Sequence, residues 1–409
     1  MVWLKSSFNK AESTFVHLDI NSCFATLEQQ ANPLFRNKPL VVTAYSGRKG
    51  CVLASSKEAK KLGIKTGMRL EVAQKIYPNL ISIVSDPNKY RFIHLQIKSL
   101  LLEYTPSVNP KSIDEFVLDF STFNSKEISN LKQTCQTIKN RIKSEIGDYV
   151  TVSVGLGPSA FLAKTASNLK KPDGLEEINF QNFLDVYSKL ELTDLTGINT
   201  KTATRLNIVG IYTVLDLYYA DITLLKKAFH SILASYWYQK IRGYDAGVWT
   251  DSVKSIGHTY TLPKASATVG ETKLVLAKLA EKVSVRLRHQ GFVAHGLSLG
   301  VRFQNQTSCH KSLTVQESLF DSSTIYCLAE KVLDIFPRLP VRNIYLTCFN
   351  LTVSSSLQLD LWGQTTKKAD LNQCLDTIKE KWGNYAIHPA SILGSQNHAP
   401  DAIGFGNIP

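Results

Sequence analysis

Residues 15–24 read FVHLDINSCF, an apolar run that carries a single acid, Asp19. Residues 15–20 have the composition of a buried strand, because apolar and β-branched side chains dominate them. A carboxylate that is buried without a partner costs several kcal/mol or takes up a proton. Asp19 therefore needs a hydrogen-bonding network or a cation, and its partners must come from elsewhere in the chain.

The best candidate partners lie in KSIDEFVLDF, residues 111–120, where Asp114 and Glu115 immediately precede a second predicted strand. Adjacent side chains on a regular strand point to opposite faces, so both acids reach one site only if the preceding turn tilts Asp114 out of the pleat. Three acids near the ends of two neighbouring strands can bind two Mg²⁺ ions for phosphoryl chemistry. Acids at strand ends also cap turns or pair with lysine, and the spacing alone does not separate these alternatives.

The rest of the chain falls into regions of different pattern. Up to about residue 171, predicted strands alternate with helices, which fits a mixed α/β sheet covered on one face. Residues 172–250 lose the strand pattern and contain short helices joined by turns. Beyond Val253 a second compact α/β unit follows, and from about residue 363 we expect an appended tail with one helix.

Composition narrows the class of protein. The 409 residues suggest roughly two to four domains. The formal charge of +13 favours a polyanionic partner such as nucleic acid, although a charge that only aids solubility explains it equally well. The seven cysteines have no zinc-ligand spacing, so we expect buried thiols in a reducing cytoplasm. No apolar stretch has signal-peptide character or approaches the ~20 residues of a membrane span.

Five motifs occur in an order that resembles one enzyme family. They are LDINSCF, SSKEAKKLGIKTGM, SIDEFVLD, VSVGLGPSAFLAKTASNLKKPDG and KSIGHTYTLP. Their order and spacing resemble the Y-family, lesion-bypass DNA polymerases, most closely the bacterial DNA polymerase IV branch. The resemblance runs unbroken from residue 14 to about residue 362.

The resemblance implies a right-hand polymerase of α/β (α+β) class with a separate α/β little finger. The domains that it implies are the catalytic palm (1–22 and 88–174), the fingers (23–87), a helical thumb with a helix-hairpin-helix (175–250), the DNA-binding little finger (253–353) and a C-terminal tail (354–409).

The resemblance also implies roles for the residues around the acids. Asp19 and Asp114 correspond to ligands of both Mg²⁺ ions, and the carbonyl of Ile20 corresponds to a backbone ligand. Glu115 corresponds to the third catalytic acid, on the ion that activates the primer 3′-OH. Phe24 corresponds to an aromatic steric gate that excludes ribonucleotides by collision with the 2′-hydroxyl. As an alternative, Phe24 is a core aromatic side chain at the start of a helix.

Three lysines, Lys57, Lys60 and Lys164, correspond to residues that reach the triphosphate of the incoming nucleotide. The family typically has Tyr in place of Lys57 and Arg or Lys in place of Lys60. Lysine lacks the stacking face of tyrosine and the fork of arginine, so these differences bear on nucleotide affinity. Cys23 and Asn21 also differ from the usual residues, but neither difference removes a metal ligand.

The segment SSSLQLDLWG contains a sequence that resembles the bacterial sliding-clamp peptide, Gln-Leu-x-Leu-Phe, with Trp in the place of Phe. The matching residues are Gln358, Leu359, Asp360, Leu361 and Trp362. In the alternative interpretation, LDLW simply ends the last strand of the preceding domain.

Taken with the resemblance, the residues predict a monomeric, template-directed DNA polymerase that adds deoxynucleotides to a primer-template with two Mg²⁺ ions and binds a sliding clamp. The alternative is a non-catalytic DNA- and clamp-binding relative with weakened nucleotide binding. The intact carboxylates argue against that alternative. A metal-dependent nuclease would share the acids but not the thumb, the little finger or the order of the nucleotide-site motifs.

Overall fold

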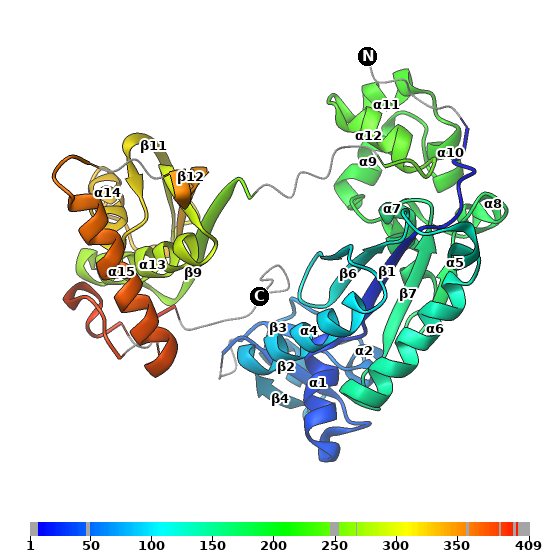
Figure 1. Ribbon diagram of the computed structural model, residues 1–409, viewed down its shortest axis with the longest axis horizontal. Helices are drawn as coiled ribbons and strands as arrows, with labels where there is room; N and C mark the ends of the chain where they lie inside the picture. Colours follow the sequence, from blue (N-terminus) through cyan, green and yellow to red (C-terminus); the bar gives the residue numbers. More distant parts are fainter. Residues whose placement is uncertain are drawn as a thin grey trace. The chain divides into compact units, whose positions relative to one another are not determined.

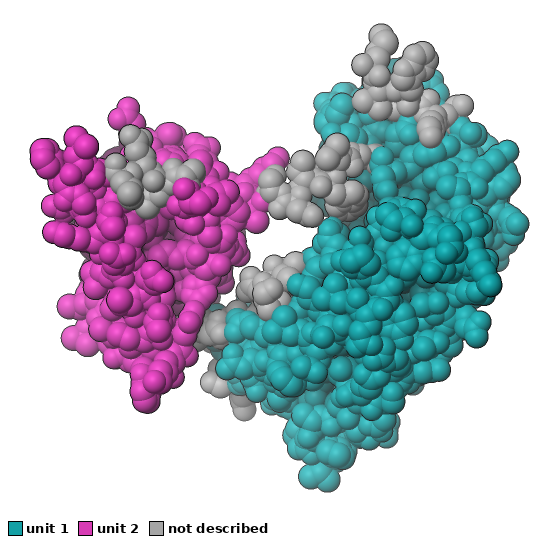
Figure 2. All heavy atoms as spheres, in the orientation of Figure 1, with its two compact units in different colours: residues 1–249, 402–409 teal, residues 250–401 magenta. Residues whose placement is uncertain are grey.

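The structure is a computed structural model of the 409-residue chain. It describes residues 7–45, 50–245, 253–266, 268–356, 360–383, 386–395 and 398–399. The chain divides into two compact units, residues 1–249 and 250–401 (Figure 2). Each unit has its own apolar core, and each is described here by itself.

The first unit is built around a five-stranded sheet of order β5-β6-β1-β7-β8 (Figure 1). The central strand β1 (Phe15–Ile20) is largely buried and pairs antiparallel with β6 (Glu115–Asp119) and with β7 (Val152–Gly157). The edge strands are β5 (Val108–Pro110) and β8 (Leu175–Glu177). The strand predicted at residues 15–20 and the strand in EFVLDF therefore form, and they are direct neighbours.

Helices cover both faces of this sheet, whereas the sequence pattern had indicated one. Helix α7 (Ala160–Leu169) follows β7 and packs on β1 and β7 so closely that a Cβ on Gly155 would lie 2.1 Å from the carbonyl oxygen of Ala163. Val154, which points the other way, packs in a core with Cys135 from the second covering layer. The helices of that layer are α4 (Pro87–Leu102), α5 (Ser125–Ser129), α6 (Leu131–Arg141) and the π-helical turn η2 (Ile142–Ile146).

The sequence region 23–87 forms a second, smaller sheet of order β3-β2-β4. Its strands are β2 (Leu40–Thr43), β3 (Val52–Ser55) and β4 (Ile81–Val84). The helices of this region are α1 (Cys23–Ala31), η1 (Pro33–Phe35), α2 (Lys57–Lys61) and α3 (Leu70–Ile76). Helix α1 begins three residues after β1 ends and contacts β2 and β3, so it connects the first sheet to the second.

Residues 183–240 form a cluster of short helices around their own aromatic and aliphatic core. The helices are α8 (Phe183–Ser188), η3 (Leu192–Asp194), α9 (Thr200–Ile208), α10 (Val214–Tyr219), α11 (Ile222–Phe229) and α12 (Leu233–Lys240). Asn199, which stands where the helix-hairpin-helix pattern usually has glycine, caps α9 by accepting the amide of Thr202 at 2.9 Å. Gly197 adopts φ +106°, a conformation that the turn requires of glycine.

The second unit contains a four-stranded antiparallel sheet of order β11-β10-β12-β9, with two helices packed on one face. The strands are β9 (Ser255–Ser266), β10 (Phe292–Phe303), β11 (Ser308–Leu319) and β12 (Val341–Val353), followed by the short turn η4 (Ser354–Ser356). The helices are α13 (Val269–His289) and α14 (Ser322–Leu333).

The stretch expected as an appended tail instead adds a docked helix to this unit. Helix α15 (Gln364–Trp382) is joined to α13 by a two-pronged ion pair between Arg288 and Asp376, at 2.6 and 2.7 Å, and by an ion pair between Lys379 and Glu281. A one-turn helix, η5 (Ala390–Ile392), also contacts α13. Mostly buried charge pairs of this kind hold α15 in a defined place.

Two expectations about compartment can be compared with the structure. The described residues include no helix that combines the length and the apolarity needed to cross a bilayer. All seven cysteines carry free thiols, but only three are buried, so the expectation of burial was wrong for part of the set. The buried thiols are Cys23, Cys135 and Cys348, and the exposed ones are Cys51, Cys327 and Cys374.

Candidate active site at the end of strand β1

The three predicted acids lie at the same end of two paired strands. Asp19 on β1 stands opposite Glu115 on β6 in the antiparallel register. Asp114 lies just before β6, and its carbonyl accepts the amide of Ile20 at 2.9 Å. The chain bends through residues 111–114, which frees Asp114 from the strand alternation that would otherwise turn it away from Glu115.

Each carboxylate has a hydrogen-bonding partner. The Nζ of Lys171 lies 2.9 Å from Oδ2 of Asp19, and the Nζ of Lys164 donates to Oε2 of Glu115 at 2.6 Å. The hydroxyl of Ser112 donates to Oδ1 of Asp114 at 2.5 Å. The lysines answer the question raised by an acid at the end of a buried strand, because an ammonium group compensates the burial of Asp19 and of Glu115.

Glu115 has a further neighbour in His17, which lies two residues before Asp19 on the same strand. His17 is almost fully buried, and its Nε2 lies 3.8 Å from Oε2 of Glu115. Its Nδ1 lies 3.1 Å from the hydroxyl of Ser167 on α7. His17 therefore links α7 to the acid on β6.

The environment shifts the pKa values of two of the acids in opposite directions. Burial raises the pKa of Asp114 to about 6, and repulsion from Asp19 and Glu115 adds to this effect. Burial also acts to raise the pKa of Glu115, but the neighbouring His17 and the hydrogen bond from Lys164 outweigh it and lower that pKa to about 2. Asp114 thus carries a negative charge that the protein alone compensates poorly.

This charge and these donor atoms fit a divalent cation. Mg²⁺ prefers carboxylate and carbonyl oxygens, which Asp19, Asp114, Glu115 and the backbone of Ile20 supply. Among the described residues, however, no three acidic, histidine or cysteine side chains converge closely enough to enclose a metal ion. The cations that contact the carboxylates of Glu115 and Asp19 are the ammonium groups of Lys164 and Lys171.

Lys171 was not identified from the sequence, although a turn signal marks its position. The segment KKPDG follows α7 directly, and its Pro-Asp-Gly pattern is typical of a turn. The side chain of Asn21 accepts the amide of Asp173 at 2.8 Å and donates to Ser153 at 2.8 Å, which ties this turn to the end of β1. The buried Lys139 holds the turn from the other side by donating to the carbonyl of Asp173 at 2.6 Å.

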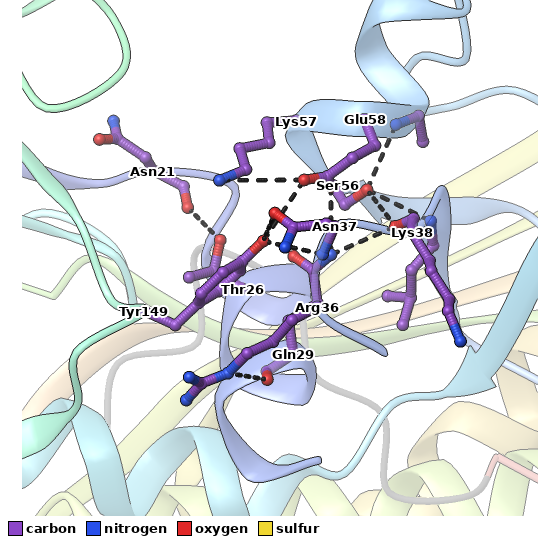
Figure 3. Close-up of polar contacts among 12 residues, drawn as sticks. Asn21, Thr26, Gln29, Arg36, Asn37, Lys38, Ser56, Lys57, Glu58 and Tyr149 are labelled. Carbon is purple, nitrogen blue, oxygen red and sulfur yellow. Dashed lines mark hydrogen bonds and ion pairs between the residues drawn. The ribbon is translucent and has the colours of Figure 1, made fainter. Parts of the chain in front are cut away.

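The predicted triphosphate lysines do not all lie together. Lys60 on α2 donates to the hydroxyl of Ser22 at 2.8 Å, and burial lowers its pKa while Asp19 and Asp114 act to raise it. Lys164 donates a hydrogen bond to Glu115. Lys57, at the start of α2, instead lies over the ring of Tyr149, with 4.7 Å between Nζ and the ring centroid (Figure 3).

Phe24 is the second residue of α1, and its side chain is fully buried. Its ring stacks on Tyr90 of α4, with 4.4 Å between centroids and an interplanar angle of 14°. The hydroxyl of Tyr90 donates to Glu28 at 2.8 Å. The ring therefore packs in the core, and it does so five residues beyond Asp19 and directly after the turn that carries Ser22.

The predicted clamp peptide lies partly outside the described residues, which do not include Gln358 and Leu359. Asp360 accepts the amides of Trp362, Gln364 and Thr365 and so caps the start of α15. The side chains of Leu361 and Trp362 are 96% and 82% exposed. The alternative that LDLW ends the last strand is wrong, because β12 ends at Val353.

The sequence and the fold both match known proteins. Residues 18–168 match the impB/mucB/samB family, and residues 253–361 match the C-terminal domain of the same family. The chain is 32% identical to DNA polymerase IV of Moorella thermoacetica, over 92% of this chain and 95% of the relative. It is 30% identical to DNA polymerase IV of Bacillus velezensis, over 95% of each chain.

Solved structures give the same result. A Y-family DNA polymerase chimera of Dbh and Dpo4 aligns with a TM-score of 0.74 and 26% identity, over 83% of this chain and 99% of that chain. An insertion ternary complex of the Dbh DNA polymerase aligns over the same shares with a TM-score of 0.61 and 26% identity. The fold and the acid-bearing strands define a right-hand polymerase of mixed α/β class. The chain belongs to the impB/mucB/samB family, the Y-family DNA polymerases, in the DNA polymerase IV branch that the motifs had indicated.

Proposed function

We propose that the chain is an active, template-directed polymerase that extends a primer opposite damaged or intact template bases, as a monomer in the cytoplasm. The observation that carries this proposal is the meeting of Asp19, Asp114 and Glu115 at one end of β1 and β6. Relatives named DNA polymerase IV that align over almost the whole chain support it. The intact set of acids argues against a non-catalytic relative.

The proposed metal ligands are Asp19, Asp114, Glu115 and the carbonyl of Ile20, which would hold two Mg²⁺ ions. Bound Mg²⁺ would lower the pKa of the primer 3′-OH and stabilise the leaving pyrophosphate. The lysines that pair with the acids would then face the nucleotide. A bound triphosphate offers these ammonium groups new anionic partners. The proposed phosphate-binding side chains are therefore the predicted Lys57, Lys60 and Lys164, together with Lys171.

The proposed domain roles follow the fold. Residues 1–22 and 88–174 contain the acid-bearing sheet and act as the palm, and residues 23–87 act as the fingers. The helical region 175–250 and the unit at 253–353 would grip the duplex as thumb and little finger. The net charge of +13 favours binding of this kind to the phosphate backbone.

Primer extension tests this proposal directly. With Mg²⁺ and all four deoxynucleotides, we expect the purified chain to lengthen a labelled primer on a matched template and to lengthen it further past a damaged base. Omitting Mg²⁺ should stop the reaction. A chain that binds primer-template DNA but adds no nucleotide would favour the non-catalytic alternative, and cleavage of the template would favour a nuclease.

The second proposed partner is a bacterial sliding clamp, bound through Gln358, Leu359, Asp360, Leu361 and Trp362. The structure supports this role by exposing Leu361 and Trp362 beyond the last strand, where a groove on a partner can take up their apolar side chains. Asp360 caps α15 and so fixes the start of the segment that presents them.

For clamp binding, we expect the double substitution Leu361→Ala and Trp362→Ala to remove clamp-stimulated synthesis and to leave synthesis without the clamp unchanged. The two side chains lie far in sequence from the palm and contribute little to the fold because both are exposed. Leu371→Ala, which changes another exposed leucine on α15, is the matched control. Equal retention of mutant and wild-type protein on an immobilised bacterial clamp would show that the peptide is not the binding element.

A further inference from the structure

Tyr149 joins the palm to the fingers beside helix α2 (Figure 3). It lies in the turn between η2 and β7, and its backbone amide donates to the side chain of Gln30 on α1 at 2.8 Å. Its hydroxyl accepts the amide of Asn37 at 3.1 Å and lies 3.4 Å from Oε1 of Glu58 on α2. One palm side chain therefore contacts both the loop after η1 and the first turn of α2.

The ring of Tyr149 also faces a cation that we expect to meet the nucleotide. The Nζ of Lys57 lies 4.7 Å from the ring centroid and 3.9 Å from Oε1 of Glu58. Although the lysine side chain is 52% exposed, an aromatic face and a carboxylate both attract its ammonium group. These two contacts keep Lys57 on the side of α2 that faces the palm.

Helix α2 contacts the palm at a second point on the same face. Lys57 and Lys60 are three residues apart and so lie side by side on a helix. Lys60 reaches the hydroxyl of Ser22, next to the acids at the end of β1. Tyr149 and Ser22 thus contact neighbouring lysines on one face of the helix. Asn21 links the two contacts, because its backbone amide donates to the carbonyl of Thr151, two residues after Tyr149.

Glu58 makes the arrangement of α2 more rigid. Its other carboxylate oxygen, Oε2, accepts the side-chain amide of Gln29 at 3.1 Å, and Gln29 is almost completely buried. Although burial opposes it, the hydrogen bond from Gln29 helps to lower the pKa of Glu58, so this carboxylate is ionised when it faces Lys57 and Tyr149. The start of α2 is therefore tied to α1 and to the palm at once.

We propose that Tyr149 is a positioning residue for nucleotide binding, which acts by holding Lys57 ready for the triphosphate. This inference rests on the proposed polymerase function. A lysine that is already ordered loses less conformational freedom when it binds a phosphate, so holding it in place strengthens nucleotide binding without touching the reacting atoms. The effect should appear in KM for the nucleotide and not in kcat.

The test compares single and double variants in steady-state primer extension. We expect Tyr149→Ala to raise the nucleotide KM about two- to fivefold, the effect that an exposed cation–π contact supports, with kcat and primer-template affinity unchanged. Lys57→Ala should raise KM by at least as much. Because Tyr149 acts through Lys57, the double variant should be no worse than Lys57→Ala alone.

Two further variants separate positioning from a general loosening of the fold. Tyr149→Phe keeps the ring under Lys57 and should retain a KM near that of the wild type. Asp148→Asn removes the neighbouring two-pronged ion pair with Arg36, at 2.8 and 3.0 Å, and the guanidinium of Arg36 also lies 5.2 Å from the ring centroid of Tyr149. Tyr149 keeps its hydrogen bonds with Gln30 and Asn37 in this variant, so KM should not change. An equal rise in KM for Asp148→Asn, or additive effects in the double variant, would overturn the positioning role. If the wild type extends primers and Tyr149→Ala has the wild-type KM, only this inference is overturned. If the wild type extends no primer, the proposed function is overturned as well.

Discussion

Asp114→Asn should abolish primer extension and leave primer-template binding intact. Asp114 stands with Asp19 and Glu115 at the end of two paired strands, and the amide that replaces it cannot supply the anionic oxygens that Mg²⁺ prefers. We expect the rate of extension to fall at least about a thousandfold, which corresponds to ~4 kcal/mol in the activation free energy. DNA affinity should survive because we expect many phosphate contacts to share it, and a single acid contributes to none of them.

Asp114 is a better probe than Glu115 because its loss should not harm the fold. Asp19 and Glu115 repel the charge of Asp114, and asparagine keeps an acceptor for the hydroxyl of Ser112. We therefore expect the melting temperature of Asp114→Asn to equal or exceed that of the wild type. Glu115→Ala should also abolish extension, but it leaves the ammonium group of Lys164 without its partner and should lower the melting temperature.

The control for this prediction is Asp119→Asn, which changes an acid at the other end of β6. Its carboxylate accepts the amide of Ser121 at 2.8 Å and lies away from the proposed metal ligands. We expect extension by this variant within about twofold of the wild type. Extension near the wild-type rate in Asp114→Asn would remove Asp114 from the metal site, and loss of DNA binding in that variant would point to a structural role.

The place of the acids at strand ends could be predicted from the sequence pattern, whereas their role as metal ligands comes from the family resemblance and stays a prediction. Asp19 and Glu115 stand out against the buried strands that carry them, and the strands pair in register so that the acids meet. Local patterns of this kind depend on neighbouring residues alone. The same holds for α7, which begins after Gly157-Pro158 because Ser159 caps it.

The lysine partners of the acids could not be found in the same way. Lys171 meets Asp19 only because Asn21 and Lys139 hold the turn around Asp173 from two distant parts of the chain. Neither contact leaves a periodic signal in the sequence. Lys57 shows the same limitation, because the resemblance identified the residue but its contact with Tyr149 depends on how residues 23–87 pack on the acid-bearing sheet.

The second substitution with a large expected effect is Phe24→Ala, which should change both the choice of sugar and the stability of the fold. We expect this variant to incorporate ribonucleotides about 10- to 200-fold more readily relative to deoxynucleotides, because alanine provides no wall against a 2′-hydroxyl. The ring is also fully buried against Tyr90, so truncation should lower the free energy of unfolding by about 3–5 kcal/mol. The assay must therefore be run well below the melting temperature of the variant.

Two control variants separate the gate from the core. Tyr90→Leu removes the stacking partner of Phe24 and should lower the melting temperature, but it should leave the choice of sugar unchanged. Phe24→Leu keeps most of the apolar volume and removes the flat ring, so it should relax the choice of sugar at a smaller cost in stability. The measurement is kcat/KM for matched ribo- and deoxynucleotides beside the melting temperature of each variant. If folded Phe24→Ala keeps the wild-type sugar ratio, then the ring is a core residue only, and the exclusion of ribonucleotides must come from another side chain.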